Sequence, residues 1–417
     1  MNNQTTTAKR LAIMKQTGQS SIDQGLFFIT PDSAPFEGSK IRYHGKTLTN
    51  LSSCSYLGLE LDERLKQAAK DAIDKYGVQY SSCRAFVECP LYAELEYLLE
   101  SIFNQYVTVN YSTSFGHLAA LPVLVEDHSL LVLDFQSHHT LRLSADYLTH
   151  RGISSKTIRH NNIHQLEQIL DEEPDDRPVW YVIDGLYSMY GDFAPIPELL
   201  GLLDRWPNLH LYIDDAHSLS WYGEQGKGYA LSCGSHQRMI VAGSLGKAFG
   251  TSGGVTLFSD KHQRDDVRLL GGPFYWGSPL TPPVLGAATA SARLHLDDTL
   301  PQLQQQLMHN VQLFTEQCHS LNIPLIANNQ TPIRYIGLGK QHVTNLVAKR
   351  WMEAGYYASA VCYPSVSRNN TGLRIGITTH LTEQDILHMT ESLAEILTTS
   401  LTPEDIHVIS RSFRRAL

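Results

Sequence analysis

The chain has 417 residues, of which 42% are hydrophobic and 18% charged, the balance of a folded globular protein with room for two to four domains. Its 33 basic and 42 acidic side chains leave a formal net charge of −9, which argues against nucleic-acid binding because that binding depends on basic side chains. The first residues lack the apolar core of a signal peptide, and no apolar run is long enough to span a bilayer. The six cysteines form no CxxC pair, so we expect reduced thiols in a cytoplasmic protein.

Short, almost wholly apolar runs predict β-strands that are covered on both faces. In chain order they are residues 108–111, 130–134, 179–184, 210–214, 239–243 and 254–258. Helical patterns lie between them, one opened by Pro90 and others at 163–170 and 196–203. This alternation predicts an α/β fold whose large domain has a mostly parallel, doubly wound sheet.

The pattern changes after Pro282 and Pro283, where a long helical stretch runs from 284 to about 321 with an interruption near 299–301. Strands at 333–338 and 373–377, with helices at 343–354 and 383–398, predict a smaller α+β C-terminal domain. Residues 403–417, which contain Arg411, Arg414 and Arg415, predict a short basic helix. We therefore expect an N-terminal arm or small-domain segment (1–59), a large domain (60–290), a small domain (291–400) and a tail (401–417).

Several common motifs are absent, because the chain has no GxGxxG after a strand, no Walker A loop and no GxSxG elbow. His138-His139 and the run from Asp214 to His217 contain metal-type ligands. Neighbouring side chains on a strand point to opposite faces, however, and no third ligand has metal-like spacing, so we expect no metal site.

Three polar segments follow predicted strands in the same part of the chain. Asp214 ends one predicted strand, with Asp215 and His217 just beyond it, and Lys247 lies in an apolar turn after another. The third segment, 109–116, is a strand that runs into hydroxyls and a glycine at the start of an apolar helix, a suitable phosphate site. On its own, an aspartate at the end of a strand is typically the N-cap of a helix. A single lysine in an apolar turn is, on its own, typically a surface residue. Together, a phosphate site, a Schiff-base lysine and a carboxylate for the pyridine nitrogen are what pyridoxal 5′-phosphate (PLP) requires.

From about Asn50 to Glu395 the chain resembles the α-oxoamine synthases, a family of fold-type I PLP enzymes. The matching segments are Tyr56-Leu-Gly-Leu, Asp134 with His138, Asp184-Gly-Leu-Tyr-Ser-Met-Tyr-Gly-Asp, Asp214-Asp-Ala-His, Ser244-Leu-Gly-Lys-Ala-Phe-Gly and Leu373-Arg-Ile. The resemblance implies that Lys247 forms the Schiff base, Asp214 pairs with the pyridine nitrogen, and His217 bonds the ring hydroxyl. It also implies that His138 stacks on the ring, with His139 as the alternative if the register shifts by one. The remaining implied cofactor contacts are Thr113, Ser114, Phe115, Ser188, Ser244 and, from a partner chain, Ser278; Ser188 is otherwise a turn hydroxyl. Arg374 and Ser55 are implied to bind substrate.

The chain departs from the family pattern at several positions. The phosphate loop S-G-[FY]-x-A-N is here Thr113-Ser-Phe-Gly-His-Leu, and Ser55 replaces an asparagine. The glycine-rich run before the predicted Pro90 helix is Gly77-Val-Gln-Tyr-Ser-Ser-Cys-Arg, and Tyr92 stands where the family has a histidine. Larger residues in place of glycine are expected to alter the substrate pocket or the backbone of the segment.

The resemblance implies a decarboxylative condensation of an α-amino acid with an acyl thioester, carried by coenzyme A or an acyl carrier protein, to give an α-amino ketone. It also implies a homodimer with a shared active site, without nucleic acid or a membrane span. The alternative is an aminotransferase or amino-acid decarboxylase on the same fold, because the cofactor residues are common to all three. A non-catalytic regulator would need a DNA-binding domain, for which the segment before Tyr56 leaves no room, and an inactive partner subunit would lack Lys247.

Overall fold

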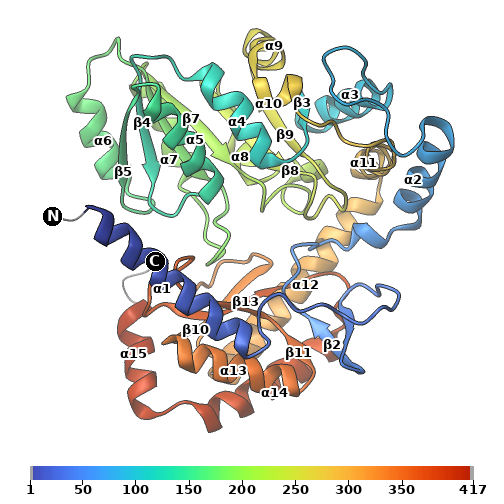
Figure 1. Cartoon of the computed structure of the whole chain (residues 1–417), viewed down its shortest axis with the longest axis vertical. Coiled ribbons are helices and arrows are strands. Elements are labelled where there is room, and N and C mark those ends of the chain that lie inside the picture. The colour runs from blue at the N-terminus through green and yellow to red at the C-terminus, as the bar shows by residue number, and fades with distance from the viewer. Residues whose placement is uncertain (1–2, 414–417) are drawn as a thin grey trace. The chain divides into compact units, whose positions relative to one another are not determined.

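The computed structural model describes residues 3–413, and the side chains of residues 8–9 and 11–409. The chain divides into two compact units (Figure 1). The larger unit comprises Leu57–Ser188 and Phe193–Gln305. The smaller unit comprises the chain up to Tyr56, Met189–Asp192, and the chain from Gln306 onward.

A seven-stranded sheet in the order β3-β9-β8-β7-β6-β4-β5 forms the centre of the larger unit. Its strands are β3 (Tyr106–Asn110), β4 (Leu130–Asp134), β5 (Ser154–Ile158), β6 (Val179–Asp184), β7 (Leu209–Asp214), β8 (Met239–Ser244) and β9 (Gly254–Phe258). The strands from β4 to β8 are parallel, whereas β9 is antiparallel to both β8 and β3. The link from β8 to β9 is too short for a crossover helix, so β9 must run antiparallel to β8.

Alternate residues of the central strands enter two different hydrophobic cores. On β6, Tyr181 and Ile183 belong to one core, whereas Trp180 and Val182 belong to the other. The first core includes residues of α3, α6, α7 and α11, and the second includes residues of α4, α5 and α9. Burial on both faces explains why these strands have continuous apolar sequences.

Two helices of the larger unit precede the first strand of its sheet, and the others come after strands along the chain. They are α2 (Glu63–Tyr76), α3 (Leu91–Phe103), α4 (Thr113–Leu124), α5 (His139–His150), α6 (Ile163–Glu172), α7 (Ile196–Arg205), α8 (Tyr229–Cys233), α9 (Lys261–Leu270), α10 (Gly272–Trp276) and α11 (Pro282–His295), with short 3-10 turns η1 (Leu59–Leu61) and η2 (Glu224–Gly226). Among the helices within residues 3–413, none has both the length and the apolarity needed to cross a membrane.

The smaller unit contains two three-stranded sheets. One joins β1 (Lys40–Tyr43), β2 (Lys46–Asn50) and β11 (Tyr356–Tyr357), and the other joins β10 (Ile333–Gly339), β13 (Thr371–Gly376) and β12 (Ser359–Val361). Its helices are α1 (Asn3–Asp23), α13 (Gln341–Glu353), α14 (Glu383–Ser400) and α15 (Pro403–Phe413). The long helix α12 (Thr299–Ser320) starts in the larger unit and continues into the smaller one.

Three features differ from the sequence predictions. The polar strand β5 was not predicted, because four of its five residues are exposed and it forms an edge of the sheet. The compact units divide at Gln305 and Gln306, whereas the expected boundary at 290/291 falls inside α11. Residues 403–413 form α15, as predicted, but Ile409 of this helix is buried in a cluster with Tyr335, so the helix is packed against the smaller unit and is not a free tail. Arg414 and Arg415 lie outside the described residues, and nothing is described of the Arg411 side chain.

Candidate active site

The buried carboxylate of Asp214, at the carboxyl end of β7, is the centre of the candidate site. Its Oδ2 lies 2.9 Å from Nε2 of His117, and its Oδ1 accepts a 3.1 Å hydrogen bond from the Ala216 amide. The other ring nitrogen of His117 lies 3.0 Å from the hydroxyl of Tyr212, two residues before Asp214 on the same strand. His117 comes from α4 and is completely buried. Tyr212, His117 and Asp214 therefore form one continuous chain of hydrogen bonds.

Two opposing influences act on the pKa of Asp214. Burial raises it, whereas the charge and hydrogen bond of His117, followed by the charges of Lys247 and His138, lower it. The lowering influences prevail, and the pKa of Asp214 lies well below its ordinary value. Asp214 is therefore a carboxylate that stays ionised in a buried setting and can keep a bound pyridine nitrogen protonated.

His138 lies in the turn between β4 and α5, where Asp184 holds its backbone. Its amide donates a 2.8 Å hydrogen bond to Oδ1 of Asp184, and its own Nδ1 lies 2.8 Å from the Thr140 hydroxyl at the start of α5. The pKa of His138 is lowered by desolvation, against the raising effect of Asp214. The charges of His138 and Asp214 thus influence each other, and the ring-stacking role of His138 stays a prediction. Burial, reinforced by Asp214, raises the pKa of Asp184 well above its ordinary value.

Lys247 lies in the tight link between β8 and β9. The amide of Leu245 donates to the carbonyl of Gly253 at 3.0 Å, and the amide of Gly250 donates to the carbonyl of Lys247 at 2.9 Å. Buried Leu245 and Phe249 anchor the link, and the Phe249 ring stacks on His295 at 4.6 Å between centroids. Lys247 itself is half-buried.

The amino terminus of α4 forms the candidate phosphate site. Ser112 caps the helix, because its hydroxyl accepts a 3.2 Å bond from the Phe115 amide and its carbonyl accepts the Gly116 amide. The amides of Thr113 and Ser114 have no acceptor within the helix, as expected for the first turn, and can bind an anion. The Thr113 hydroxyl donates to the carbonyl of Gly243 at 2.9 Å, which ties this helix end to β8. A Cβ at Gly254 would collide with the Thr113 amide nitrogen, so this approach requires glycine.

A second buried carboxyl, Asp215, follows Asp214 directly. Its Oδ2 accepts a 2.9 Å hydrogen bond from the Ala230 amide, whereas its Oδ1 has no hydrogen-bond partner among the described residues. Burial is the main cause that raises the pKa of Asp215 to about 7. A Cβ at Gly185 would collide with Oδ1, so the carboxyl is packed against backbone.

Arg374 belongs to the smaller unit, on β13, and its surroundings there are buried. Its Nη2 lies 3.5 Å from the Cys54 sulfur and 3.4 Å from the Tyr56 hydroxyl. Burial opposes the charged form, but Cys54 and Tyr56 outweigh it and raise the pKa of Arg374. Ser55 lies next to these groups in the chain, and its hydroxyl is 2.7 Å from that of Ser53. The segment is held to β13 by the Gly376 amide, which donates to the carbonyl of Leu51 at 2.7 Å.

The glycine-poor segment before α3 is fixed by Arg84. Its guanidinium forms ion pairs with Glu88 (2.5 Å) and Glu96 (2.9 Å), and lies 3.7 Å from the centre of the Tyr92 ring. The Tyr92 hydroxyl accepts a 2.6 Å bond from the Leu280 amide. The tyrosine in place of the family's histidine therefore has a structural role here.

The other predicted site residues are found in the larger unit. His217 is buried and lies three residues after Asp214 in the chain, and Ser188 is half-buried. Ser244 is buried at the end of β8, and its hydroxyl accepts a 3.1 Å hydrogen bond from the Gly246 amide. Ser278 is exposed, and its predicted contact across a dimer stays a prediction. Sequence reasoning missed His117. The available indication was a histidine in an apolar helix, at the alanine position of the phosphate loop.

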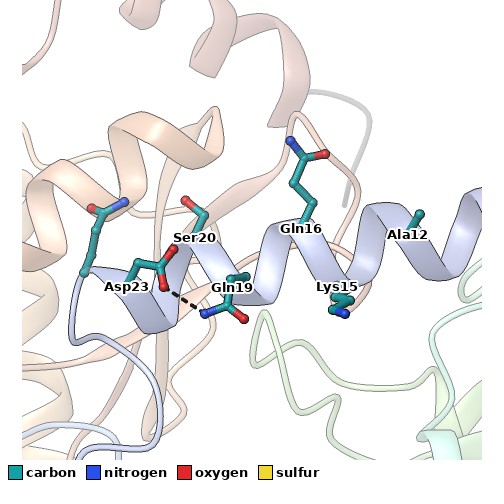
Figure 2. Close-up of a pocket in the computed structure, with 7 residues that line it drawn as sticks. Ala12, Lys15, Gln16, Gln19, Ser20 and Asp23 are labelled. Carbon is teal, nitrogen blue, oxygen red and sulfur yellow. Dashed lines mark hydrogen bonds between the residues drawn. The ribbon is translucent and has the colours of Figure 1, made fainter.

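A separate surface pocket of about 580 Å³ lies along α1 (Figure 2). It is lined by residues that include Ala12, Lys15, Gln16, Gln19, Ser20 and Asp23. The Asp23 carboxylate accepts a 2.8 Å hydrogen bond from the Gln19 amide group, as Figure 2 shows. This lining contains none of the predicted site residues.

Comparisons with known proteins find relatives of this chain in sequence and in fold. The family "Aminotransferase class I and II" matches residues 46–393. The 8-amino-7-oxononanoate synthase of Alkaliphilus oremlandii is 29% identical over 396 residues, which cover 93% of this chain and 97% of the relative. That of Coprothermobacter proteolyticus is 30% identical over 374 residues, 87% of this chain and 92% of the relative.

Solved structures show the same fold. A serine palmitoyltransferase from S. paucimobilis with bound PLP and myriocin superimposes with a TM-score of 0.86 at 21% identity, and covers 94% of this chain and 98% of its own. The 8-amino-7-oxononanoate synthase of Francisella tularensis gives a TM-score of 0.70 at 21% identity, with 84% and 98% covered. The chain therefore belongs to the aminotransferase class I and II family, within its α-oxoamine synthase branch.

Proposed function

We propose that the protein condenses an α-amino acid with an acyl thioester and releases carbon dioxide. The bond from the amino acid Cα to the acyl carbon forms, and two bonds break: the carbon–sulfur bond of the thioester and the bond from Cα to the carboxylate carbon. Cα first gives up one proton and takes one back after carbon dioxide leaves, and the released thiolate takes up a proton. The products are an α-amino ketone, carbon dioxide and a free thiol. The observation that carries the proposal is the buried carboxylate of Asp214 at the end of β7, 2.9 Å from Nε2 of His117. Burial raises the pKa of Asp214, but His117, followed by Lys247 and His138, lowers it by more, so Asp214 stays ionised.

PLP is the cofactor of this family, and the residues present fit it. Asp214 would hold the pyridine nitrogen, Lys247 the aldehyde carbon, and the α4 amino terminus with Ser244 the phosphate. The first-turn amides of Thr113 and Ser114 offer the donors that a phosphate needs. When bound, the cofactor supplies an electron sink for the negative charge that develops at the substrate Cα.

The chain's own groups divide the remaining work. Lys247 Nζ is the base that takes the proton from the substrate Cα. Asp214 remains ionised throughout and so keeps a protonated ring nitrogen paired. His138 would orient the ring, and its own position is fixed by the hydrogen bond that its backbone amide donates to Oδ1 of Asp184. His217 and Ser188 bind the ring substituents, and Phe115 packs at the phosphate loop.

We propose that Arg374 binds the substrate carboxylate, with Ser55 beside it. A buried guanidinium in a setting that favours its charged form can pair with a carboxylate through two parallel hydrogen bonds. The acyl group arrives on coenzyme A or on an acyl carrier protein.

We also propose a homodimer in which Ser278 contacts the phosphate of the other subunit. Large apolar side chains are exposed near this residue in the chain: Trp276 is 60% exposed and its ring packs on Phe86, which is 80% exposed. Such exposed apolar groups mark interaction surfaces. The six free cysteines fit a reducing compartment, and we place the protein in the cytoplasm.

The first experiment tests the cofactor and its lysine. Purified protein supplied with PLP is expected to be yellow, and borohydride followed by peptide mass spectrometry should find the cofactor fixed to Lys247. The Lys261→Ala variant, which changes an exposed lysine in α9, should label like the wild type, whereas Lys247→Ala should not label. A wild type that stays colourless with added PLP would refute the proposal.

The second experiment tests the reaction. A panel of amino acids is offered with acyl-coenzyme A and acyl carrier protein thioesters, and products are identified by mass spectrometry. An α-amino ketone together with free thiol supports the condensation. Conversion of the cofactor to its pyridoxamine form without any thioester would instead indicate an aminotransferase, and a simple amine product a decarboxylase.

A further inference from the structure

The histidine in contact with Asp214 occupies a position where the family's phosphate loop has alanine. His117 is completely buried, and its Nε2 lies 2.9 Å from Oδ2 of Asp214. The two residues are 97 positions apart, and they meet because α4 packs on the face of the sheet to which Tyr212 points. A histidine here gives Asp214 a hydrogen-bond donor that an alanine cannot supply.

The direction of the hydrogen bond between His117 and Asp214 follows from the chemistry of the two side chains. The ionised Asp214 can only accept, so Nε2 of His117 carries a proton and donates to Oδ2. The Tyr212 hydroxyl lies 3.0 Å from Nδ1 and fixes the orientation of the ring. A donor held by a second hydrogen bond of its own sets the direction and basicity of the group that it contacts.

We infer that His117 is a positioning residue that holds the Asp214 carboxylate ionised and correctly oriented for the pyridine nitrogen of PLP. The inference rests on the proposed function, because it deepens the role of the same site. Removing the donor should weaken PLP binding and shift the ring nitrogen toward its unprotonated form.

Other charged groups surround Asp214 and define the background of the test. Lys247 lies after β8, His138 before α5, and Asp184 at the end of β6; all three interact electrostatically with Asp214. Asp215 follows it in the chain and carries a raised pKa. Because these groups are unchanged in the His117 variants, a difference between variants reports on His117.

The experiment compares His117→Leu, which removes the donor, with His117→Gln, whose side-chain amide can still donate to Asp214. Tyr212→Phe removes the group that orients His117. The control is His210→Gln, because His210 is a histidine at the opposite end of β7 that stacks on Trp180 at 4.6 Å and does not contact Asp214. For each protein we measure the PLP dissociation constant, the nitrogen-15 chemical shift of the labelled ring nitrogen, and the thermal stability of the apoprotein.

We expect His117→Leu to bind PLP about 10- to 100-fold more weakly, the loss typical of a hydrogen bond to a charged group. Its ring-nitrogen shift should move toward the unprotonated value. His117→Gln should recover most of both properties, Tyr212→Phe should lose about 2- to 10-fold, and His210→Gln should match the wild type.

Three results would overturn the inference. In the first, His117→Leu keeps wild-type affinity and the wild-type ring-nitrogen shift. In the second, His117→Leu and His117→Gln lose affinity equally, with an unchanged ring-nitrogen shift and a less stable apoprotein, which indicates a packing role. In the third, the wild type itself binds no PLP, which overturns the proposed function and this inference with it; the first two leave the proposed function intact.

Discussion

The first prediction concerns Asp215, whose buried carboxyl has a raised pKa. Its carboxyl is fully buried, has one oxygen without a hydrogen-bond partner among the described residues, and follows the ionised Asp214. These conditions raise its pKa from the ordinary 3.8 to about 7, with burial as the largest cause. The Asp215→Asn variant keeps the shape of the side chain and the acceptor for the Ala230 amide, but it carries no charge at any pH.

The magnitude follows from linkage. Between pH 3.8 and 7 the folded protein retains the Asp215 proton that the unfolded chain releases, so the free energy of unfolding falls as the pH rises through this window. At about 1.4 kcal/mol per pKa unit, the cost reaches about 4 kcal/mol above pH 7. Relative to the wild type, Asp215→Asn should therefore gain about 3 kcal/mol of stability between pH 5 and pH 8.

The assay is urea unfolding of the apoproteins, followed by tryptophan fluorescence at pH 5 and pH 8. The matched control is Asp74→Asn, an exposed aspartate in α2, whose difference from the wild type should be the same at both pH values. If Asp215→Asn also differs from the wild type by the same amount at pH 5 and pH 8, the assignment of a raised pKa to Asp215 is refuted.

Two further predictions concern the segment around α3. Tyr92→Phe removes the hydroxyl that accepts the hydrogen bond of the Leu280 amide but keeps the ring that packs on Arg84. It should cost about 1–3 kcal/mol of unfolding free energy, measured by urea denaturation. An unchanged denaturation midpoint would contradict the hydrogen bond. Arg84→Met leaves the buried Glu96 carboxylate with fewer hydrogen-bond donors and should cost about 3–5 kcal/mol of unfolding free energy. Combining Arg84→Met with Glu96→Gln should recover part of that loss. A double variant no more stable than Arg84→Met would contradict the ion pair as the cause.

The strands and the family segments could be predicted from the sequence alone. Three predicted strands, 130–134, 179–184 and 254–258, have the same bounds as β4, β6 and β9. Strands that are buried on both faces are apolar at nearly every position, so their sequence marks them without tertiary information. Asp214 and Lys247 were found because Asp214 ends such a strand and Lys247 comes shortly after another, at the carboxyl edge of the sheet where ligands bind.

Other features were decided only by tertiary structure. The polar β5 is a strand because it pairs with β4, and its own sequence has no apolar alternation. The antiparallel direction of β9 follows from the short link that carries Lys247. Most of all, the contact of His117 with Asp214 joins residues 97 positions apart and depends on how α4 packs on the sheet. Local sequence patterns report burial and chain direction, but which distant side chains share a hydrogen bond depends on the packing of whole elements.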